Sequence, residues 1–318
     1  MDLGDGPIAI TGATGWLGRA TLDLLAGALG PEAFGVRVRA YARTPREISL
    51  SDGTPIEVRA LDRLPAEPPA DGLLAHFAYR TREQAAEAGL GTYVQDNVAI
   101  TATVVAAVRA GAPAGILLPS SGAIYDRPER RLATDLETNP YGTLKHLDEL
   151  AFTGLCSERG VRLVVARVFN VSGPPMIKPQ GYALGSLICA ALAGEPLVVR
   201  ATRPVRRSYV AISELVRVAL ARLVDLEAPP MTTFDTADQE VVEMGELADR
   251  VRRALGRDDL DVVREAFNPD APADDYVGDP AALAELAERY GVALTPLDEQ
   301  IRATAEGLGS RIRPGGRY

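Results

Sequence analysis

The strongest constraint on the fold is the stretch 8–25, in which a short apolar run leads through Gly12, Gly15 and Gly18 into a helical pattern. In a strand–turn–helix unit, the first glycine allows a turn that a Cβ would block. The second lets the backbone approach a pyrophosphate, and the third lets the helix pack closely on the strand. The N–H groups and the positive end of the helix would then face the anion. The stretch therefore predicts a dinucleotide site near the start of the chain.

Strands and helices alternate along the first half of the chain, which favours a parallel sheet. The expected strands are 8–10, 36–42, 56–61, 73–77, 116–118 and 163–168, and the expected helices are 92–110 and 141–159. We therefore expect an α/β fold: a Rossmann-like, doubly wound parallel sheet with a smaller, mixed α/β C-terminal substrate lobe. The Rossmann domain is expected over 1–171, with about 208–235 returning to it, and the substrate lobe over about 172–207 and 236–318.

Composition narrows the range of partners. The chain has 43 acidic and 34 basic residues, a net charge of −9, which disfavours nucleic acid and anionic membrane surfaces. No apolar run approaches the roughly 20 residues of a membrane span, and the first residues lack the basic segment of a signal peptide. We expect a cytoplasmic protein with a small-molecule substrate, without nucleic-acid, membrane or metal partners.

The end of the second expected strand bears on the choice of cofactor. In dinucleotide folds an acid at this point binds the ribose 2′-hydroxyl of NAD, whereas an arginine accommodates the 2′-phosphate of NADP. Arg43 closes the strand, and Arg46 follows as a second cation. The sequence therefore favours NADP(H), with NAD(H) as the alternative. A solvated loop arginine is the competing interpretation.

Tyr141 and Lys145 lie one helical turn apart, which places a phenol and an ammonium on the same face. A phenol with a pKa near ~10 is a poor acid–base group at neutral pH, and an adjacent cation favours its phenolate. The chain has ten tyrosines but only two lysines, Lys145 and Lys178, so a chance match of this spacing is rare. The pair predicts a tunable proton donor, against the alternative of a surface helix pair.

These segments and several others resemble the extended short-chain dehydrogenase/reductases, the NAD(P)-dependent epimerase/dehydratase family that acts mostly on nucleotide sugars. The resemblance runs nearly end to end, and the motifs occur in the family's order. The similar segments are 11–18, 76–78, 120–125, 141–145, 167–174 and 207–210, with Asn97 where the family has an asparagine in its central helix.

The resemblance implies a Ser-Tyr-Lys mechanism. Tyr141 would be the general acid/base, Lys145 would hold the nicotinamide ribose and lower the pKa of Tyr141, and Ser121 would hydrogen-bond the reacting sugar oxygen. The implied cofactor contacts are Gly12, Thr14, Gly15, Trp16, Leu17, Gly18, Arg43, Asp62, Phe77, Ala78, Asn97 and Lys145. The implied substrate contacts are Tyr79, Ser121, Asn170 and Arg207, the last two at the nucleotide-diphosphate end.

Two departures from the family pattern bear on the reaction. Sugar dehydratases carry an Asp-Glu pair after the Ser/Thr, whereas this chain has Gly122 and Ala123, which argues against dehydration by that route. Many members have an arginine for the diphosphate shortly before the residue matching Asp279, whereas the nearest arginine here is Arg264, further back. Whether the substrate carries a nucleotide is therefore left open.

The favoured function is the NADPH-dependent reduction of a keto group, commonly at C4, of a nucleotide-activated sugar. The alternative is an NAD(P)-dependent nucleotide-sugar 4-epimerase, which needs the same three catalytic residues. A non-catalytic NADP-binding protein is the remote alternative.

The resemblance also implies a homodimer in which the helices from Thr92 and Tyr141 pair across a two-fold axis. The apolar positions Val98, Val105 and Leu147 suit such a contact. They suit packing on the sheet equally well, so both interpretations stand.

Overall fold

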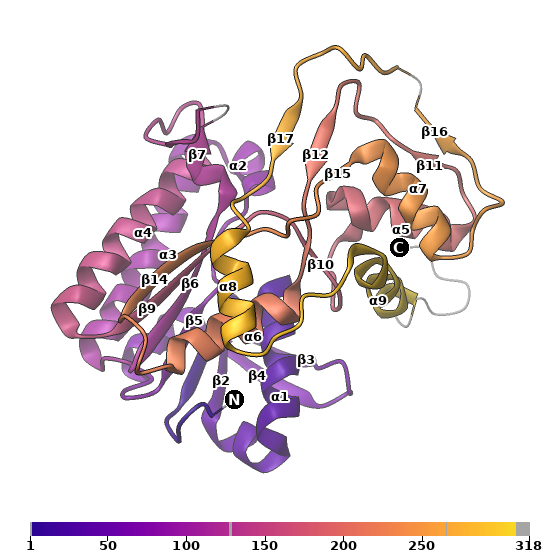
Figure 1. The fold of residues 1–318 in the computed structure, drawn as a ribbon. Coiled ribbons are helices and arrows are strands. Elements are labelled where there is room, and N and C mark those ends of the chain that lie inside the picture. The colour runs from indigo at the N-terminus through magenta and orange to yellow at the C-terminus, as the bar shows by residue number, and fades with distance from the viewer. Residues whose placement is uncertain (1, 127–128, 265, 310–318) are drawn as a thin grey trace. The chain divides into compact units, whose positions relative to one another are not determined.

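The computed structural model describes residues 2–126, 129–264 and 266–309. The chain divides into two compact units, each built from two stretches of sequence (Figure 1). Unit 1 comprises Met1–Val168 and Val216–Phe234, and unit 2 comprises Phe169–Leu215 and Asp235–Tyr318.

An eight-stranded sheet, in the order β14-β9-β6-β5-β1-β2-β4-β3, organises unit 1. Its strands are β1 (Ile8–Thr11), β2 (Val38–Ala42), β3 (Arg46–Ser49), β4 (Pro55–Ala60), β5 (Leu73–His76), β6 (Gly115–Ser121), β9 (Arg162–Val168) and β14 (Met231–Thr236). β1 pairs in parallel with both β2 and β5, parallel pairing continues to β4 on one side and to β6 and β9 on the other, and β3 is antiparallel. The chain leaves β4 and returns beside β1, so the predicted doubly wound, Rossmann-like α/β fold is confirmed.

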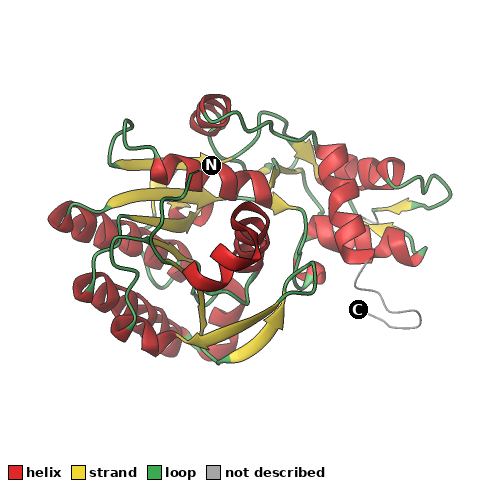
Figure 2. Cartoon of the chain, turned by 90° about the horizontal axis from the view of Figure 1, so that it is seen from below, coloured by secondary structure: helices red, strands yellow, loops and turns green. Residues whose placement is uncertain are grey.

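Helices cover the sheet of unit 1. They are α1 (Trp16–Arg37), α2 (Arg82–Ala88), α3 (Leu90–Ala110), α4 (Pro140–Arg159) and the 3-10 turns η1 (Leu61–Ala66) and η2 (Gly122–Ile124), and α6 (Ile212–Val224) crosses the boundary between the units. Val104 and Val108 of α3 and Phe152 of α4 pack with Ile116 and Leu118 of β6 in one core. Figure 2 shows the helices in red and the strands in yellow. A short hairpin of β7 (Tyr125–Asp126) and β8 (Arg131–Leu132) follows η2.

Three local predictions need correction. The strand expected over 36–42 begins at Val38, because α1 breaks at Gly30 (φ 73°) and resumes through Arg37. Pro31 follows the break, at a helix start where its missing N–H costs nothing. Strand β3 is absent from the prediction because it is a four-residue edge strand. Helix α2 was missed although Thr81 and Gln84 form a capping box, whose sequence signature was available.

Unit 2 is a mixed α/β lobe. Its strands are β10 (Val171–Ser172), β11 (Leu197–Val198), β12 (Val205–Arg207), β13 (Val210–Ala211), β15 (Val242–Glu243), β16 (Val262–Val263) and β17 (Asp274–Tyr276). They form the small sheets β15-β12-β17, β10-β13 and β11-β16. Its helices are α5 (Ala183–Ala193), α7 (Met244–Ala254), α8 (Ala281–Arg289), α9 (Leu297–Gly309) and the 3-10 turn η3 (Pro179–Gly181), and α5, α7 and α9 pack on one another.

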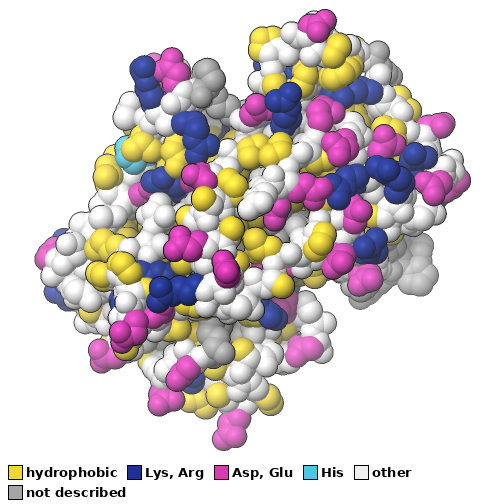
Figure 3. Space-filling model, viewed as in Figure 1, with side chains coloured by type: hydrophobic (Ala, Val, Ile, Leu, Met, Phe, Trp, Pro, Cys, Tyr) yellow, Lys and Arg dark blue, Asp and Glu magenta, His cyan; other side chains and the backbone are white. Residues whose placement is uncertain are grey.

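Acidic and basic side chains are interspersed over the face shown in Figure 3, in keeping with the mixed charge of the sequence. Among the described residues, none of the helices combines the length and the apolar character that crossing a membrane requires.

Candidate active site

The glycine-rich turn between β1 and α1 leaves no room for side chains at two positions. Gly12 has a φ of +66°, and a Cβ there would stand 2.4 Å from the backbone of Phe77, just after β5. A Cβ on Gly18 would stand 2.3 Å from the carbonyl oxygen of Gly12. Gly15 is the N-cap of α1 and brings no side-chain acceptor to the first turn. The turn is therefore a bare backbone cradle at the positive end of a helix, a geometry suited to a phosphate.

Three other predicted cofactor contacts surround the same turn. Thr14 and Leu17 are half-buried, and Trp16 is buried.

Arg43 and Arg46 lie beyond the end of β2, and both are exposed. Asp62 lies in η1 and is also exposed. Since Ala42 pairs with Ala60 in parallel strands, the segments that begin at Arg43 and Leu61 leave the same edge of the sheet.

The end of β5 is tied to the glycine-rich turn by Thr11. The carbonyl of Thr11 accepts a hydrogen bond from Phe77 N (3.1 Å), and its hydroxyl accepts one from Ala78 N (3.2 Å). The same hydroxyl lies 2.8 Å from Nδ1 of His76. Burial, with a smaller contribution from the Lys145 charge, lowers the pKa of His76 to about 3. The imidazole is therefore neutral and belongs to the core that supports the site.

Asn97 on α3 is buried and fixes the segment after β5. Its amide oxygen accepts from Arg80 N (2.8 Å), and its amide nitrogen donates to the carbonyl of Tyr93 (3.2 Å). Both of its polar groups therefore have partners within the protein. Its predicted contact with the cofactor stays a prediction.

Ser121 and the start of α4 are locked together by Asn139. Ser121 Oγ accepts from Ala123 N (3.1 Å) at the end of β6. Asn139 caps α4 by accepting from Gly142 N (3.0 Å), and it donates to the carbonyl of Ala123 (2.9 Å). A Cβ on Gly142 would stand 2.0 Å from that carbonyl oxygen. The sequence predicts the helix over 141–159 but not these positioning contacts of Asn139.

Lys145 is buried against the ring of Tyr79. Its Nζ donates to the carbonyl of Pro119 (3.1 Å) and lies 3.6 Å from the centre of the Tyr79 ring. The Tyr79 ring in turn meets Tyr141 edge-on, with the centroids 5.9 Å apart. Burial lowers the pKa of Lys145 to about 8, although Asp148 and Glu149 oppose the shift. The predicted Tyr-Lys pair thus shares one aromatic neighbour, Tyr79, whose own pKa burial raises.

Two predicted substrate residues belong to unit 2. Asn170 donates to the carbonyls of Ser208 (3.2 Å) and Tyr276 (3.3 Å). Arg207 donates from Nη1 to the carbonyl of Asp274 (2.8 Å), and its Nη2 lies 3.7 Å from the Asp274 carboxylate. Both side chains therefore connect β17 to neighbouring parts of unit 2.

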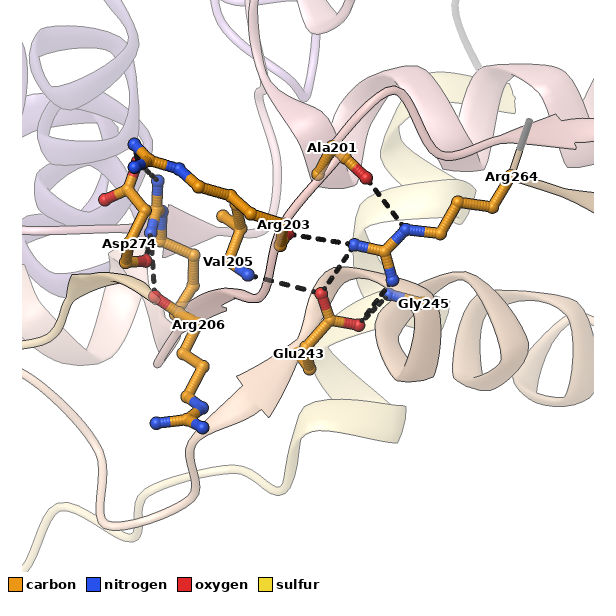
Figure 4. A network of polar contacts seen from close by, with 9 residues as sticks. Ala201, Arg203, Val205, Arg206, Glu243, Gly245, Arg264 and Asp274 are labelled. Carbon is orange, nitrogen blue, oxygen red and sulfur yellow. Dashed lines mark hydrogen bonds and ion pairs between the residues drawn. The ribbon is translucent and has the colours of Figure 1, made fainter. Parts of the chain in front are cut away.

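Arg264, the nearest arginine to the family's diphosphate position, is bound to other groups of the protein. Figure 4 shows its guanidinium paired with Glu243, at 3.1 Å for Nη1–Oε2 and 2.9 Å for Nη2–Oε1. It also donates to the carbonyls of Ala201 (2.8 Å) and Arg203 (3.1 Å). Each of its three nitrogens is engaged, so Arg264 ties the loop between β11 and β12 to Glu243 of β15 and has little capacity left for a phosphate.

The sequence of the chain is similar to those of known enzymes. The sequence model of the NAD dependent epimerase/dehydratase family matches residues 8–234. The chain is 25% identical over 339 residues to a UDP-glucose 4-epimerase of Azospirillum brasilense, covering 89% of this chain and 97% of that protein. It is 26% identical over 168 residues to UDP-glucuronic acid decarboxylase 6 of Arabidopsis thaliana, covering 50% of this chain and 48% of the relative.

Solved structures share the fold. A UDP-N-acetylglucosamine 4-epimerase from Methanobrevibacter ruminantium M1, in complex with UDP-N-acetylmuramic acid, superposes with a TM-score of 0.74 at 19% identity, covering 97% of this chain and 99% of that one. A UDP-glucose 4-epimerase from Brucella ovis, in complex with NAD, gives 0.74 at 23% identity, covering 96% and 98%. The family match spans well over half of the chain and includes the glycine-rich turn, Ser121, Tyr141 and Lys145, so the chain belongs to the NAD-dependent epimerase/dehydratase family of enzymes.

Proposed function

We propose that the protein is an NAD(P)-dependent 4-epimerase of a nucleotide-activated sugar. The observation that carries the proposal is the arrangement of Tyr141 and Lys145 around the Tyr79 ring, with the ammonium buried 3.6 Å from the ring centre. Relatives support the epimerase over the keto-reductase that the sequence favours, because the near full-length relative and both structural neighbours described above are 4-epimerases.

The turn after β1 fits a dinucleotide. A Cβ at Gly12 or Gly18 would clash with backbone and deform the turn, and the N-terminus of α1 offers backbone N–H groups to a pyrophosphate. Gly12, Thr14, Gly15, Trp16, Leu17 and Gly18 would hold the pyrophosphate side, and Asp62, Phe77, Ala78, Asn97 and Lys145 the rest. A bound nicotinamide ring supplies reversible hydride transfer at the sugar carbon.

Residues of this chain transfer the proton of the sugar hydroxyl group. Tyr141, as phenolate, takes the proton of the sugar C4 hydroxyl when the carbon is oxidised and returns it when the carbon is reduced on its other face. The Lys145 charge favours the phenolate. Ser121 hydrogen-bonds the same sugar oxygen, and Tyr79 borders the sugar. Gly122 and Ala123 supply no carboxylate for dehydration.

The cofactor is proposed as NAD(H). The solved structure of the Brucella ovis epimerase contains NAD, and so does that of MoeE5, a second protein whose fold is similar to that of this chain. One observation favours NADP(H), and with it the reductase: Arg43 and Arg46 are both exposed where β2 ends. The two functions differ in whether the cofactor is consumed.

The substrate is proposed as a UDP-hexose, with Asn170 and Arg207 toward the diphosphate. The supporting observation is that curated relatives and structural neighbours are described with UDP-sugars. The Arg264 guanidinium is paired with Glu243 at 2.9 Å, whereas that of Arg207 lies 3.7 Å from the Asp274 carboxylate, so Arg207 is the proposed cation for this end of the substrate.

The test is to incubate the purified protein with NAD⁺ and, separately, UDP-glucose, UDP-N-acetylglucosamine and UDP-glucuronic acid, and to follow the anomeric protons by NMR. Interconversion at C4 without net change in absorbance at 340 nm supports the epimerase. Stoichiometric oxidation of NADPH by a 4-keto nucleotide sugar would replace it with the reductase. Binding of NAD(P) without turnover of any of these sugars would favour the non-catalytic alternative.

We also propose a homodimer formed through α3 and α4. Val98 on α3 and Leu147 and Leu150 on α4 are 53%, 48% and 58% exposed, which is unusual for large apolar side chains on neighbouring helices. Val105, in contrast, packs against the core of unit 1. Three of these positions are therefore available for a second copy.

A further inference from the structure

The ammonium of Lys145 lies in an unusually dry environment. Lys145 is 6% exposed, and its ammonium contacts the Pro119 carbonyl and the face of the Tyr79 ring. An ammonium has three N–H donors, and taking it out of water favours the neutral amine unless nearby negative charge compensates. The proposed role of Lys145 requires the charged form. The structure must therefore supply that compensation.

Two buried carboxylates follow Lys145 on α4, Asp148 and Glu149, each 7% exposed. Glu149 is neutralised by Arg167, which donates to it from Nε (3.0 Å) and Nη2 (2.7 Å). Asp148 accepts from the Thr101 hydroxyl on α3 at Oδ1 (2.8 Å). Its Oδ2 is buried and has no hydrogen-bond partner among the described residues. Asp148 is therefore the carboxylate of this cluster whose charge no arginine offsets.

We infer that Asp148 is a positioning residue that keeps the buried Lys145 protonated, so that a positive charge stands beside Tyr141 at neutral pH. Positions 145 and 148 share one face of α4. Opposite charges in a buried cluster interact more strongly than they would in water. The hydrogen bond from Thr101 favours the ionised carboxylate, against the burial that raises the pKa of Asp148.

Four other titratable side chains near the cluster, His76, Tyr79, Tyr93 and Arg167, keep one charge state between pH 5 and 8. Burial lowers the pKa of His76 to about 3 and raises those of Tyr79 and, to about 12, Tyr93. Arg167 stays charged, and it remains paired with Glu149. Asp148 is therefore the acid whose removal changes the field at Lys145 without releasing another buried charge. The inference rests on the proposed function in one respect only, namely that the charge of Lys145 serves to favour the Tyr141 phenolate.

The test reads the protonation of Lys145 directly, without cofactor or substrate. The full chain, labelled with [ε-¹³C]lysine, contains two lysines, and Lys178 is exposed and serves as the internal reference. The Lys178→Arg variant assigns the two Cε signals. We expect the midpoint of Lys145 near pH 8 in the parent, and about one pH unit lower in Asp148→Asn. The midpoint of Lys178 should not move.

The matched control is Glu158→Gln, which removes one negative charge from an exposed position of the same helix and should leave Lys145 unchanged. Equal Lys145 midpoints in the parent and in a folded Asp148→Asn protein would overturn the inference. If Asp148→Asn does not fold by circular dichroism, Asp148→Ser, which removes the charge with a smaller polar side chain, is measured instead. Failure of the epimerase assay would leave this result intact, so the two proposals fail separately.

Discussion

Gly142 lies so close to Ala123 that a Cβ on the glycine would stand 2.0 Å from the alanine carbonyl oxygen. The obstacle is backbone and cannot rotate away. We predict that Gly142→Ala displaces α4 from the Ser121 loop and lowers the free energy of unfolding by about 1–3 kcal/mol. The turnover number should fall further than stability alone explains, because Tyr141 and Ser121 lose their relative placement.

The control for this prediction is Gly154→Ala, in the same helix but with open space around the added methyl. It should stabilise the protein by about 0.5–1 kcal/mol, since glycine is the poorer helix former. Urea unfolding measures both variants. Equal midpoints for the two would refute the close approach.

Removal of the Tyr141 hydroxyl tests the proton-transfer role. In Tyr141→Phe the ring and its edge contact with Tyr79 remain, but no group exchanges the proton. The turnover number should fall by about 10²–10⁴-fold, while the Kd for NAD⁺ by calorimetry changes little. Tyr182→Phe, at an exposed position of unit 2, is the control. Full activity in Tyr141→Phe would remove this residue from the mechanism.

His76 should make the protein sensitive to acid. The pKa of His76 is about 3 in the folded protein, below its ordinary value of 6.5. Between pH 3 and 6.5 the imidazole therefore binds a proton in the unfolded chain but not in the folded one. Stability is therefore complete above pH 6.5 and falls as the pH drops toward 3, with a slope of up to about 1.4 kcal/mol per pH unit from this group. Urea unfolding of His76→Asn, which can still meet Thr11, should show a shallower slope between pH 6 and 4. Parallel slopes would contradict the prediction.

The Glu243–Arg264 pair should stabilise unit 2. Burial disfavours the Glu243 carboxylate, but the hydrogen bonds from Arg264, Gly245 and Val205 outweigh it and hold the pKa of Glu243 below its ordinary value. The stabilisation is thus present at neutral pH and lost as the pH falls through that lowered pKa. Glu243→Gln should cost about 1–3 kcal/mol at pH 7, measured by thermal unfolding. Glu288→Gln, at an exposed position on α8, should cost far less.

The exposed leucines of α4 allow a test of the dimer. Leu147→Glu combined with Leu150→Glu places two like charges on the proposed contact, and the protein should become monomeric by light scattering at micromolar concentration. Leu226→Glu adds one such charge at a position that is 78% exposed, in the loop after α6, and should leave the assembly unchanged. A parent protein that is already monomeric would end the proposal.

The sequence allowed prediction of features that depend on local chemistry. Strand β1, the turn at Gly12 and the presence of Tyr141 and Lys145 on one helix follow from spacing within about twenty residues. The contacts of Arg264 with Ala201 and Glu243 could not be predicted from the sequence. These partners are brought to Arg264 by the pairing of β11 with β16 and of β12 with β15. Likewise, the local pattern places Asp148 beside Glu149, but only the fold assigns Arg167 to one of them.

The tightness of the turn at Gly12 and Gly18 also limits how this enzyme can evolve. Neither position admits even a methyl group without moving backbone, so the cradle is closed to adaptive change. Arg43, by contrast, is exposed and unconstrained by packing. A laboratory selection for a switch between the two coenzymes should therefore leave the cradle intact and accumulate its substitutions around Arg43.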